Sequence, residues 1–219
     1  MPQRAPDLPT PTTPNGPSPN ERICGGRSGR RRGVLRRRND TTTMILFLDF
    51  DGVLHPDAVY LVNGRPQLRA EGSLFMWAPI LEANLDPYPQ VQIVLSTSWV
   101  RVLKSFTRTR AYLPAALQAR VIGATWHSAM ARHHEGAHRV EASWFSELSR
   151  YAQIARYIAR AGLRAEHWLA IDDDSEEWPA ELRDHLVETD GALGLASASA
   201  QLELAQRLEG MAAKTLSGK

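Results

Sequence analysis

The chain has 219 residues, of which 43% are hydrophobic, and a formal net charge of +2. This length suits one domain with a tail, and the hydrophobic share is that of an ordinary globular protein. No apolar run reaches the roughly 18 residues that a membrane span needs, so we expect no insertion into a membrane. The single cysteine, Cys24, allows no intrachain disulfide, and we therefore expect a reducing compartment, the cytoplasm.

Residues 1–43 differ in composition from the rest of the chain. They are rich in Pro, Thr, Ser, Gly and Arg and hold no aromatic residue, so we predict a disordered basic tail. Nine arginines and three acids give this tail a charge of +6, which leaves −4 on residues 44–219. The tail could contact nucleic-acid phosphates, could serve as a targeting peptide, or could lie upstream of a true start at Met44.

The run of apolar residues 45–48 predicts a buried strand, which ends in two acids, Asp49 and Asp51, and in Gly52, which can bend the chain. Buried carboxylates are costly unless a partner offsets their charge. Mg²⁺ prefers such hard oxygen ligands, and sites in open α/β sheets lie at the carboxyl ends of strands. The run therefore predicts part of a magnesium-dependent site.

Two further apolar runs also end in polar side chains. The run 91–95 is followed by Ser96 and Thr97, and the run 168–171 is followed by Asp172 and Asp173. Both runs have the length and apolar character of buried strands. A strand with two acids, a strand with hydroxyls and a strand with acids thus follow one another along the chain.

The remaining elements alternate with these strands. Asn63-Gly64 between β-prone residues 58–62 and 66–69 predicts a β-hairpin. Helical patterns cover 74–85, 99–117 with an interruption at Pro114, 142–161 and 201–213, with a short strand or loop at 120–123 and a helix-to-strand element at 182–187. Gly162 is expected to cap the third of these helices.

Alternating strands and helices predict a parallel, doubly wound α/β sheet. About 40 residues separate the first two motif strands, and about 50 separate the second from Arg150. Neither gap holds a large cap domain once its helices are subtracted. We therefore expect one α/β domain over 44–219 with a β-hairpin flap and no large cap.

The tryptophans and a group of histidines also carry expectations. Trp99 and Trp168 flank motif strands and are expected in the core, whereas the other four tryptophans could be core or could offer a stacking surface for bases. A local histidine cluster favours a solvent-exposed loop over a zinc site. Its members are His127, His133, His134 and His138.

The segments LFLDFDGVLHP, IVLSTSW, RVIGAT and WLAIDDD together resemble the HAD (haloacid dehalogenase-like) domain of Swiss Army Knife RNA repair proteins, over residues 44 to about 204. The resemblance implies a HAD-like Rossmannoid fold whose hairpin flap covers the acid pair. It implies that Asp49 is a nucleophile and that Asp51 is the general acid/base. Asp49 and the backbone carbonyl of Asp51 would hold Mg²⁺.

The same resemblance assigns roles to later residues. Asp173, with Asp172 beside it, would complete the Mg²⁺ site, and Ser96, or Thr97 in its place, would bind the phosphoryl oxygens. A basic residue would neutralise the nucleophile and the phosphate, and Arg150 is the expected one because it precedes a helical face. The alternatives for this cation are Arg101, Lys104 and Arg139.

These roles imply a Mg²⁺-dependent phosphatase that acts through an aspartyl-phosphate intermediate. A phosphorylated substrate is the expected partner, and the family name together with an open, uncapped site favours RNA or DNA ends in RNA repair. A small-metabolite phosphatase is one alternative. A catalytically silent HAD-fold module that binds nucleic acid or protein is another, although intact acids in both acidic motifs argue against it.

Overall fold

The computed structural model describes residues 43–127, 145 and 147–217. Residues 1–42 of the predicted tail lie outside the described residues, as do the cluster members His133, His134 and His138 and also Arg139 and Trp144. Five strands form one sheet in the order β5-β4-β1-β6-β7, and every neighbouring pair is parallel. The strands are β1 (Met44–Leu48), β4 (Val91–Leu95), β5 (Val121–Ala124), β6 (Trp168–Asp172) and β7 (Leu186–Glu188).

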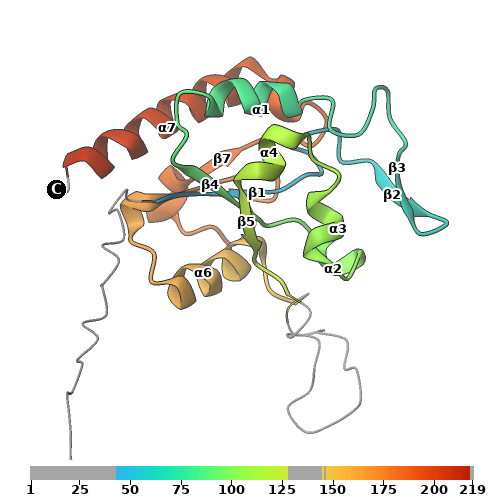
Figure 1. Ribbon diagram of the computed structural model, residues 1–219, viewed down its shortest axis with the longest axis horizontal. Coiled ribbons are helices and arrows are strands. Elements are labelled where there is room, and N and C mark those ends of the chain that lie inside the picture. The colour runs from blue at the N-terminus through green and yellow to red at the C-terminus, as the bar shows by residue number, and fades with distance from the viewer. Residues whose placement is uncertain (1–42, 128–144, 146, 218–219) are drawn as a thin grey trace, which may run out of the picture. The chain divides into compact units, whose positions relative to one another are not determined.

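The central strand β1 divides its side chains between the two faces of the sheet. Successive side chains of a strand point to opposite faces, so Leu46 and Leu48 join one apolar cluster and Phe47 joins another. Helices α1 (Ala78–Leu85) and α7 (Ala198–Ser217) pack into the first cluster, and α6 (Arg150–Ala161) packs into the second through Ile154. Figure 1 shows α1 and α7 on one face and α6 on the other. The doubly wound sheet predicted from the sequence is confirmed.

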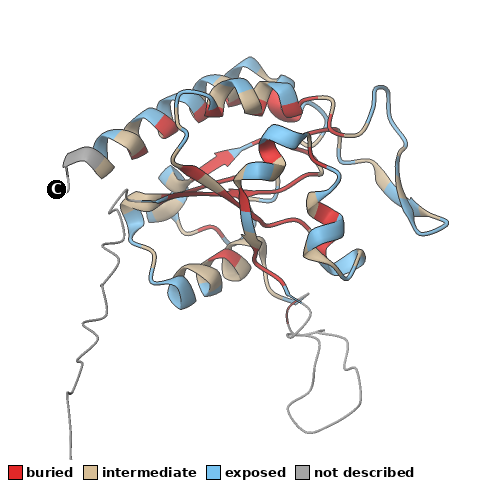
Figure 2. Cartoon of the chain, in the orientation of Figure 1, coloured by how far each residue is buried: buried red, intermediate tan, exposed pale blue. Residues whose placement is uncertain are grey.

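Burial follows these layers. All five residues of β1 and of β6 are buried, as expected for strands covered by helices on both faces. Figure 2 shows the buried strands between helices whose outer surfaces are exposed. Short 3-10 helices make several connections, namely η2 (Ala165–His167), η3 (Ala180–His185) and η4 (Gly194–Ala196). The predicted helix-to-strand element at 182–187 corresponds to η3 followed by β7.

The helix predicted over 99–117 is broken more often than expected. It consists of α2 (Trp99–Val102), α3 (Phe106–Arg110) and α4 (Ala115–Arg120). Besides the break at Pro114, the chain turns at Lys104, whose φ of 53° is left-handed. Ser105 then begins α3 as its N-cap, because its hydroxyl accepts a hydrogen bond from the amide of Arg108 at 3.2 Å.

Helix α1 begins later than the predicted 74. Phe75 has a φ of 62°, a left-handed conformation that a right-handed helix cannot include. The helix therefore begins at Ala78, with Pro79 in its first turn, where proline is tolerated.

Helix α6 is also shorter than the predicted 142–161. Ser149 is its N-cap and accepts a hydrogen bond from the amide of Ala152 at 3.3 Å. The residues from 147 to 149 are not helical, and most of 142–146 lies outside the described residues. At the other end, Gly162 takes the left-handed conformation, with a φ of 64°, and caps the helix as predicted.

The predicted hairpin is confirmed. Strands β2 (Val59–Val62) and β3 (Arg65–Leu68) pair in antiparallel fashion. The two residues between them, Asn63 and Gly64, both have positive φ, 50° and 75°, as a two-residue type I′ turn requires. No large cap domain is present among the described residues. Within the same part of the chain, no helix has both the length and the apolar character to cross a membrane.

We predict that Phe47→Ala destabilises the domain by about 3–5 kcal/mol. The Phe47 side chain is fully buried and meets the rings of Tyr157 and Trp168 edge-on at 5.4 and 6.1 Å between centroids. Urea unfolding followed by circular dichroism measures the loss. Leu202→Ala is the control, because Leu202 is 60% exposed and its truncation should change the unfolding free energy by less than about 0.5 kcal/mol. Equal effects of the two substitutions would contradict the packing described here.

Candidate active site

The carboxyl ends of β1 and β6 bring three acids together. Oxygen atoms of Asp49, Asp172 and Asp173 lie within 4.8 Å of one another. Asp49 directly follows β1 and Asp172 is the last residue of β6, and the two strands are neighbours in the sheet. Parallel neighbours end at the same edge, so acids far apart in the sequence meet there.

Gly52 allows the chain to pass close to Asp173. Its φ of +66° is left-handed, and a Cβ at this position would lie 2.1 Å from the Oδ2 atom of Asp173. Any side chain here would strain the backbone and displace that carboxylate. The turn is fixed from the other side by Thr189, whose hydroxyl donates a hydrogen bond to the Gly52 carbonyl at 2.8 Å.

Burial makes the negative charge of this acid cluster costly. Burial raises the pKa of Asp49, an effect that Arg150 opposes. Burial also raises the pKa of Asp172 well above its ordinary value, and the charge of Asp49 adds to that rise. The pKa of Asp173 is raised to about 7, first by burial and then by Asp49 and Asp57. The three acids therefore resist simultaneous ionisation unless a cation joins them.

Arg150, the first residue of α6, supplies one positive charge. Its Nη2 atom lies 2.8 Å from Oδ2 of Asp49, and its Nε atom lies 2.9 Å from Oδ2 of Asp172. Its Nη1 atom donates to the backbone carbonyl of Ser96. Burial alone would lower the pKa of Arg150, but the nearby acids, Asp49 and Asp172 foremost, together outweigh burial and raise it. The guanidinium is therefore charged at every accessible pH.

Two of the other candidate cations form no ion pair with the cluster. Arg101 and Lys104 are exposed, and neither forms an ion pair with a described acid. Arg139 lies outside the described residues. Arg150 is thus the candidate that the structure brings to Asp49.

The donor set fits a divalent cation. The Oδ2 atom of Asp172 is buried, and its 2.9 Å contact with Nε of Arg150 is an ion pair without hydrogen-bond alignment. One guanidinium against three carboxylates also leaves negative charge uncompensated. Mg²⁺ takes carboxylate oxygens as ligands, so Asp49, Asp172 and Asp173 could hold it. The side chain of Asp51 is not part of this cluster.

The two hydroxyl residues after β4 face different surroundings. A hydrogen bond from the Thr97 hydroxyl contributes to lowering the pKa of Asp49, and Thr97 also accepts from the amide of Trp99 at 3.3 Å. Ser96 is fully buried, and its hydroxyl has no hydrogen-bond partner among the described residues. Of the two, Thr97 is the residue whose hydroxyl reaches Asp49, while Ser96 contacts Arg150 through its carbonyl.

Asp51 is held by two residues that the sequence did not mark as functional. The indole Nε1 of Trp99 donates to Oδ2 of Asp51 at 2.8 Å, and Nε2 of His55 lies 3.1 Å from Oδ1. The other ring nitrogen of His55 accepts from the amide of Phe75 at 3.3 Å. Since Nδ1 is an acceptor, the proton of a neutral His55 is on Nε2, which donates to Asp51.

The left-handed backbone of Phe75 directs its amide at His55. Such a conformation costs about 1–2 kcal/mol for a residue other than glycine, and strained residues gather at functional sites. His55 is fully buried, and its ring lies 4.9 Å from that of Phe75 and 5.8 Å from that of Trp99. An aromatic shell therefore fixes the two donors that hold Asp51.

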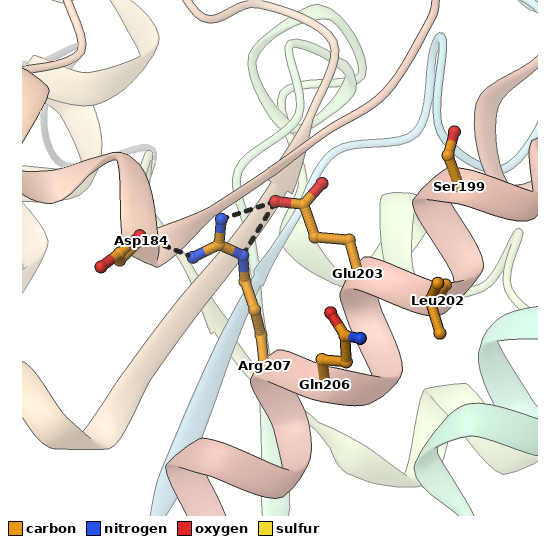
Figure 3. Close-up of a pocket in the computed structure, with 6 residues that line it drawn as sticks. All are labelled: Asp184, Ser199, Leu202, Glu203, Gln206 and Arg207. Carbon is orange, nitrogen blue, oxygen red and sulfur yellow. Dashed lines mark hydrogen bonds and ion pairs between the residues drawn. The ribbon is translucent and has the colours of Figure 1, made fainter.

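A depression of about 450 Å³ lies elsewhere on the protein. Figure 3 shows its side chains around Arg207, which pairs with Glu203 at 2.6 Å and with Asp184 at 3.5 Å. Its charged groups are thus largely paired with one another, and none of its lining residues belongs to the acid cluster. The depression offers no comparable chemistry.

The parallel sheet with its acid cluster defines a domain of the HAD superfamily. The family model for the HAD domain in Swiss Army Knife RNA repair proteins matches residues 45–200, and the chain belongs to this family. Membership points to a phosphohydrolase-type function, and HAD domains generally use a divalent metal. No curated protein matches the chain, and no solved structure matches it either.

We predict that the metal-free protein loses stability as the pH rises from about 4 to about 7. In this window the folded state keeps a proton on Asp173, whose pKa is about 7. The unfolded chain has already released this proton, because the pKa of the carboxyl there is near 3.8. Stability is therefore highest below the unfolded value and declines through the folded one. Urea unfolding in chelator at pH 4.5 and 7.5 measures the difference.

Asp173→Asn is the matched variant, because it keeps the shape of the side chain and removes its charge. It should reduce the pH dependence and unfold at higher urea than the unaltered protein at pH 7.5. It should also weaken Mg²⁺ binding, measured by calorimetry at the same pH. An unchanged pH dependence in this variant would contradict the repulsion inferred for Asp173.

Proposed function

We propose that the protein is a Mg²⁺-dependent phosphatase that hydrolyses phosphomonoesters through an aspartyl-phosphate intermediate. One observation carries this proposal, namely that Asp49, Asp172 and Asp173 converge within 4.8 Å while Arg150 pairs with two of them. A buried carboxylate beside a fixed cation, with further acids for a metal, is suited to attack on phosphorus.

Asp49 is the proposed nucleophile. The amide of Phe50 donates to its Oδ1 atom at 2.7 Å, and Arg150 holds its Oδ2 atom at 2.8 Å. These contacts fix the carboxylate in orientation, which is most of what phosphoryl transfer asks of a protein. The Arg150 guanidinium also balances the negative charge of the incoming phosphoryl group.

The hydroxyl of Thr97 is proposed to bind a phosphoryl oxygen, because it is already directed to Asp49. The hydroxyl of Ser96 is the alternative donor, since it is buried without a partner among the described residues. Either would stabilise the charge that spreads over the equatorial oxygens. When bound, Mg²⁺ would supply further charge neutralisation there, held by Asp49, Asp172 and Asp173 and by the backbone carbonyl of Asp51.

Asp51 is the proposed general acid/base. It would give a proton to the leaving oxygen and later take one from the water that hydrolyses the aspartyl-phosphate. Each of its oxygens accepts one donor, from His55 or from Trp99, and keeps a lone pair that can carry the proton. His55 and Trp99 are positioning residues, because they act on the reaction only through Asp51.

The proposed substrates are phosphorylated ends of RNA or DNA. The family description supports this class, since it refers to RNA repair proteins. The absence of a large cap domain among the described residues also leaves room for a bulky substrate. The described chemistry would serve a small phosphorylated metabolite equally well, so the test includes both.

We predict that Asp49→Asn lowers phosphate release at least about a thousandfold, because the amide cannot form the covalent intermediate. The assay measures phosphate release by the full chain with Mg²⁺ from 3′- and 5′-phosphorylated RNA and DNA, nucleotides, phosphopeptides and sugar phosphates. Asp184→Asn is the matched control, since the Asp184 side chain is 96% exposed and should retain full activity.

Release from nucleic-acid ends, lost in Asp49→Asn, supports the whole proposal. Release only from small metabolites keeps the chemistry and removes the repair substrate. Retained Mg²⁺-dependent activity in Asp49→Asn would refute the nucleophile. No release from any substrate by folded, metal-bound protein would favour a silent binding module.

We predict that Trp99→Phe lowers kcat roughly tenfold or more with little change in KM, because a misplaced catalytic group is costly. Phenylalanine keeps most of the ring packing and removes the donor to Asp51. Trp178→Phe is the matched control, since the indole nitrogen of Trp178 is buried and has no hydrogen-bond partner among the described residues. Equal kcat values for the two variants would exclude a role for the Trp99–Asp51 bond.

A further inference from the structure

The segment that follows β4 differs in charge from the rest of the domain. Residues 96–120 include α2, α3 and α4, and they hold five basic residues and no acid. No acid occurs anywhere in the sequence between Asp86 and Glu135, although residues 44–219 as a whole carry a net charge of −4. A stretch of one sign in a domain of the other sign creates a positive potential at its surface, which attracts anions.

Three of these cations are unpaired. Arg101, Lys104 and Arg108 are exposed, and none of them forms an ion pair with a described acid. Exposed arginines elsewhere in the domain differ, since Arg164 and Arg183 pair with acids at 2.6 and 3.0 Å. The three cations are therefore available to a ligand.

The three unpaired cations belong to neighbouring elements. The amide of Lys104 donates to the carbonyl of Arg101 at 3.1 Å, so these two residues lie at either end of one tight turn. Arg108 is in α3, which contacts α2, and Figure 1 shows the two helices side by side. We refer to Arg101, Lys104 and Arg108 as the α2–α3 surface.

This surface begins next to the proposed reaction centre. The hydroxyl of Thr97, shortly before α2, reaches Asp49. The indole nitrogen of Trp99, the first residue of α2, donates to Asp51 at 2.8 Å. Arg101 is two residues further, about 3 Å along the helix axis. A polymer whose end lies at Asp49 would therefore meet these cations within its first few units.

A nucleic-acid strand fits this arrangement better than other phosphorylated ligands do. It carries one phosphate per nucleotide, so a strand whose terminal phosphate lies at Asp49 presents further phosphates close by. Arginine and lysine side chains contact such phosphates without reading the sequence. A small phosphorylated metabolite has no second group to place on the α2–α3 surface, and a phosphopeptide has no regular repeat of negative charge.

We propose that the α2–α3 surface binds the backbone phosphates of a single-stranded nucleic acid whose phosphorylated end occupies the site at Asp49. Its cations act on binding and not on the chemistry, because Arg150 is the cation that pairs with Asp49. This inference rests on the proposed function, since that function places the phosphorylated end at Asp49. It assigns the preference for a polymer to residues outside the acid cluster.

Binding tests the proposal without requiring turnover. The full chain with Asp49→Asn is titrated with fluorescent single-stranded RNA hexamers in Mg²⁺, and anisotropy is followed at several salt concentrations. One hexamer carries a 3′-phosphate and the other a 5′-phosphate, and the variants are compared on the hexamer that binds more tightly. The test variant adds Arg101→Gln and Lys104→Gln, which remove two charges and keep long polar side chains.

The matched control adds Arg164→Gln and Lys214→Gln, which remove the same charge elsewhere. Arg164 directly precedes η2 and β6, so it lies at the amino end of the strand that carries Asp172 at its carboxyl end. Lys214 is in the last turn of α7, and Figure 1 shows this end of α7 at the opposite end of the domain from α2. Residues 1–43 are identical in all the proteins, so any difference in Kd reports on the substituted side chains.

We expect the test variant to bind the hexamer about tenfold or more weakly at about 0.1 M salt, whereas the control should change Kd less than about twofold. The slope of log Kd against log salt concentration should fall by about 1.4 in the test variant, because each phosphate contact of a single strand contributes about 0.7. The control should keep the slope of the parent chain.

Equal Kd values and slopes for the two variants would overturn the proposal. Tighter binding of an acidic peptide of the same net charge than of either hexamer would overturn the class of ligand. Phosphate release by the unaltered chain from the same hexamers tests the proposed function separately. Release together with equal Kd values would keep the phosphatase and refute the surface, whereas weakened binding without any release would support the surface and refute the phosphatase.

Discussion

The buried guanidinium of Arg150 is the interaction on which the rest of the site depends. It joins the ends of three adjacent strands, through the Ser96 carbonyl after β4, Asp49 after β1 and Asp172 at the end of β6. Without it, the acids would face one another in a buried place, where uncompensated charge costs several kcal/mol. One guanidinium still cannot balance three carboxylates, and this residual charge is what makes the site receptive to a divalent cation. The same guanidinium thus joins the strand ends and sets the charge of the site.

Much of the fold follows from local patterns that packing did not override. The apolar runs that form β1, β4 and β6 are buried on both faces, and the Asn63-Gly64 turn has the positive φ angles that only certain residues adopt readily. Helix boundaries were predicted less well. Helix α1 begins late because Phe75 is left-handed, and the segment after Trp99 breaks at Lys104, where no proline or glycine marks the turn. The deviation at Phe75 accompanies the contact of its amide with His55, which a linear pattern does not contain.

The candidate site, like the fold, could be predicted from the sequence only in part. Acids that directly follow strands could be identified from the sequence, because the sheet itself brings them together. The contacts of Asp51 could not be, since Trp99 was expected only as a core residue and His55 carried no expectation. Their roles come from the direction of one ring nitrogen each, which spacing along the chain does not reveal. The choice between Ser96 and Thr97 likewise depends on which hydroxyl faces Asp49. The two residues are neighbours after the end of β4, and the sequence does not show which of them points to the acid.

The long sequence separation within the site has a consequence for the synthesis of the protein. Arg150 is 101 residues from Asp49, and Thr189 is 137 residues from the Gly52 carbonyl that it holds. Pairing between such distant segments is slow, because a large loop must close before any contact compensates. On the ribosome, Asp49 after β1 therefore meets Asp172 and Asp173 only once β6 has emerged. A cation that needs ligands from both strands cannot guide the nascent chain, and its binding energy stabilises only the completed fold.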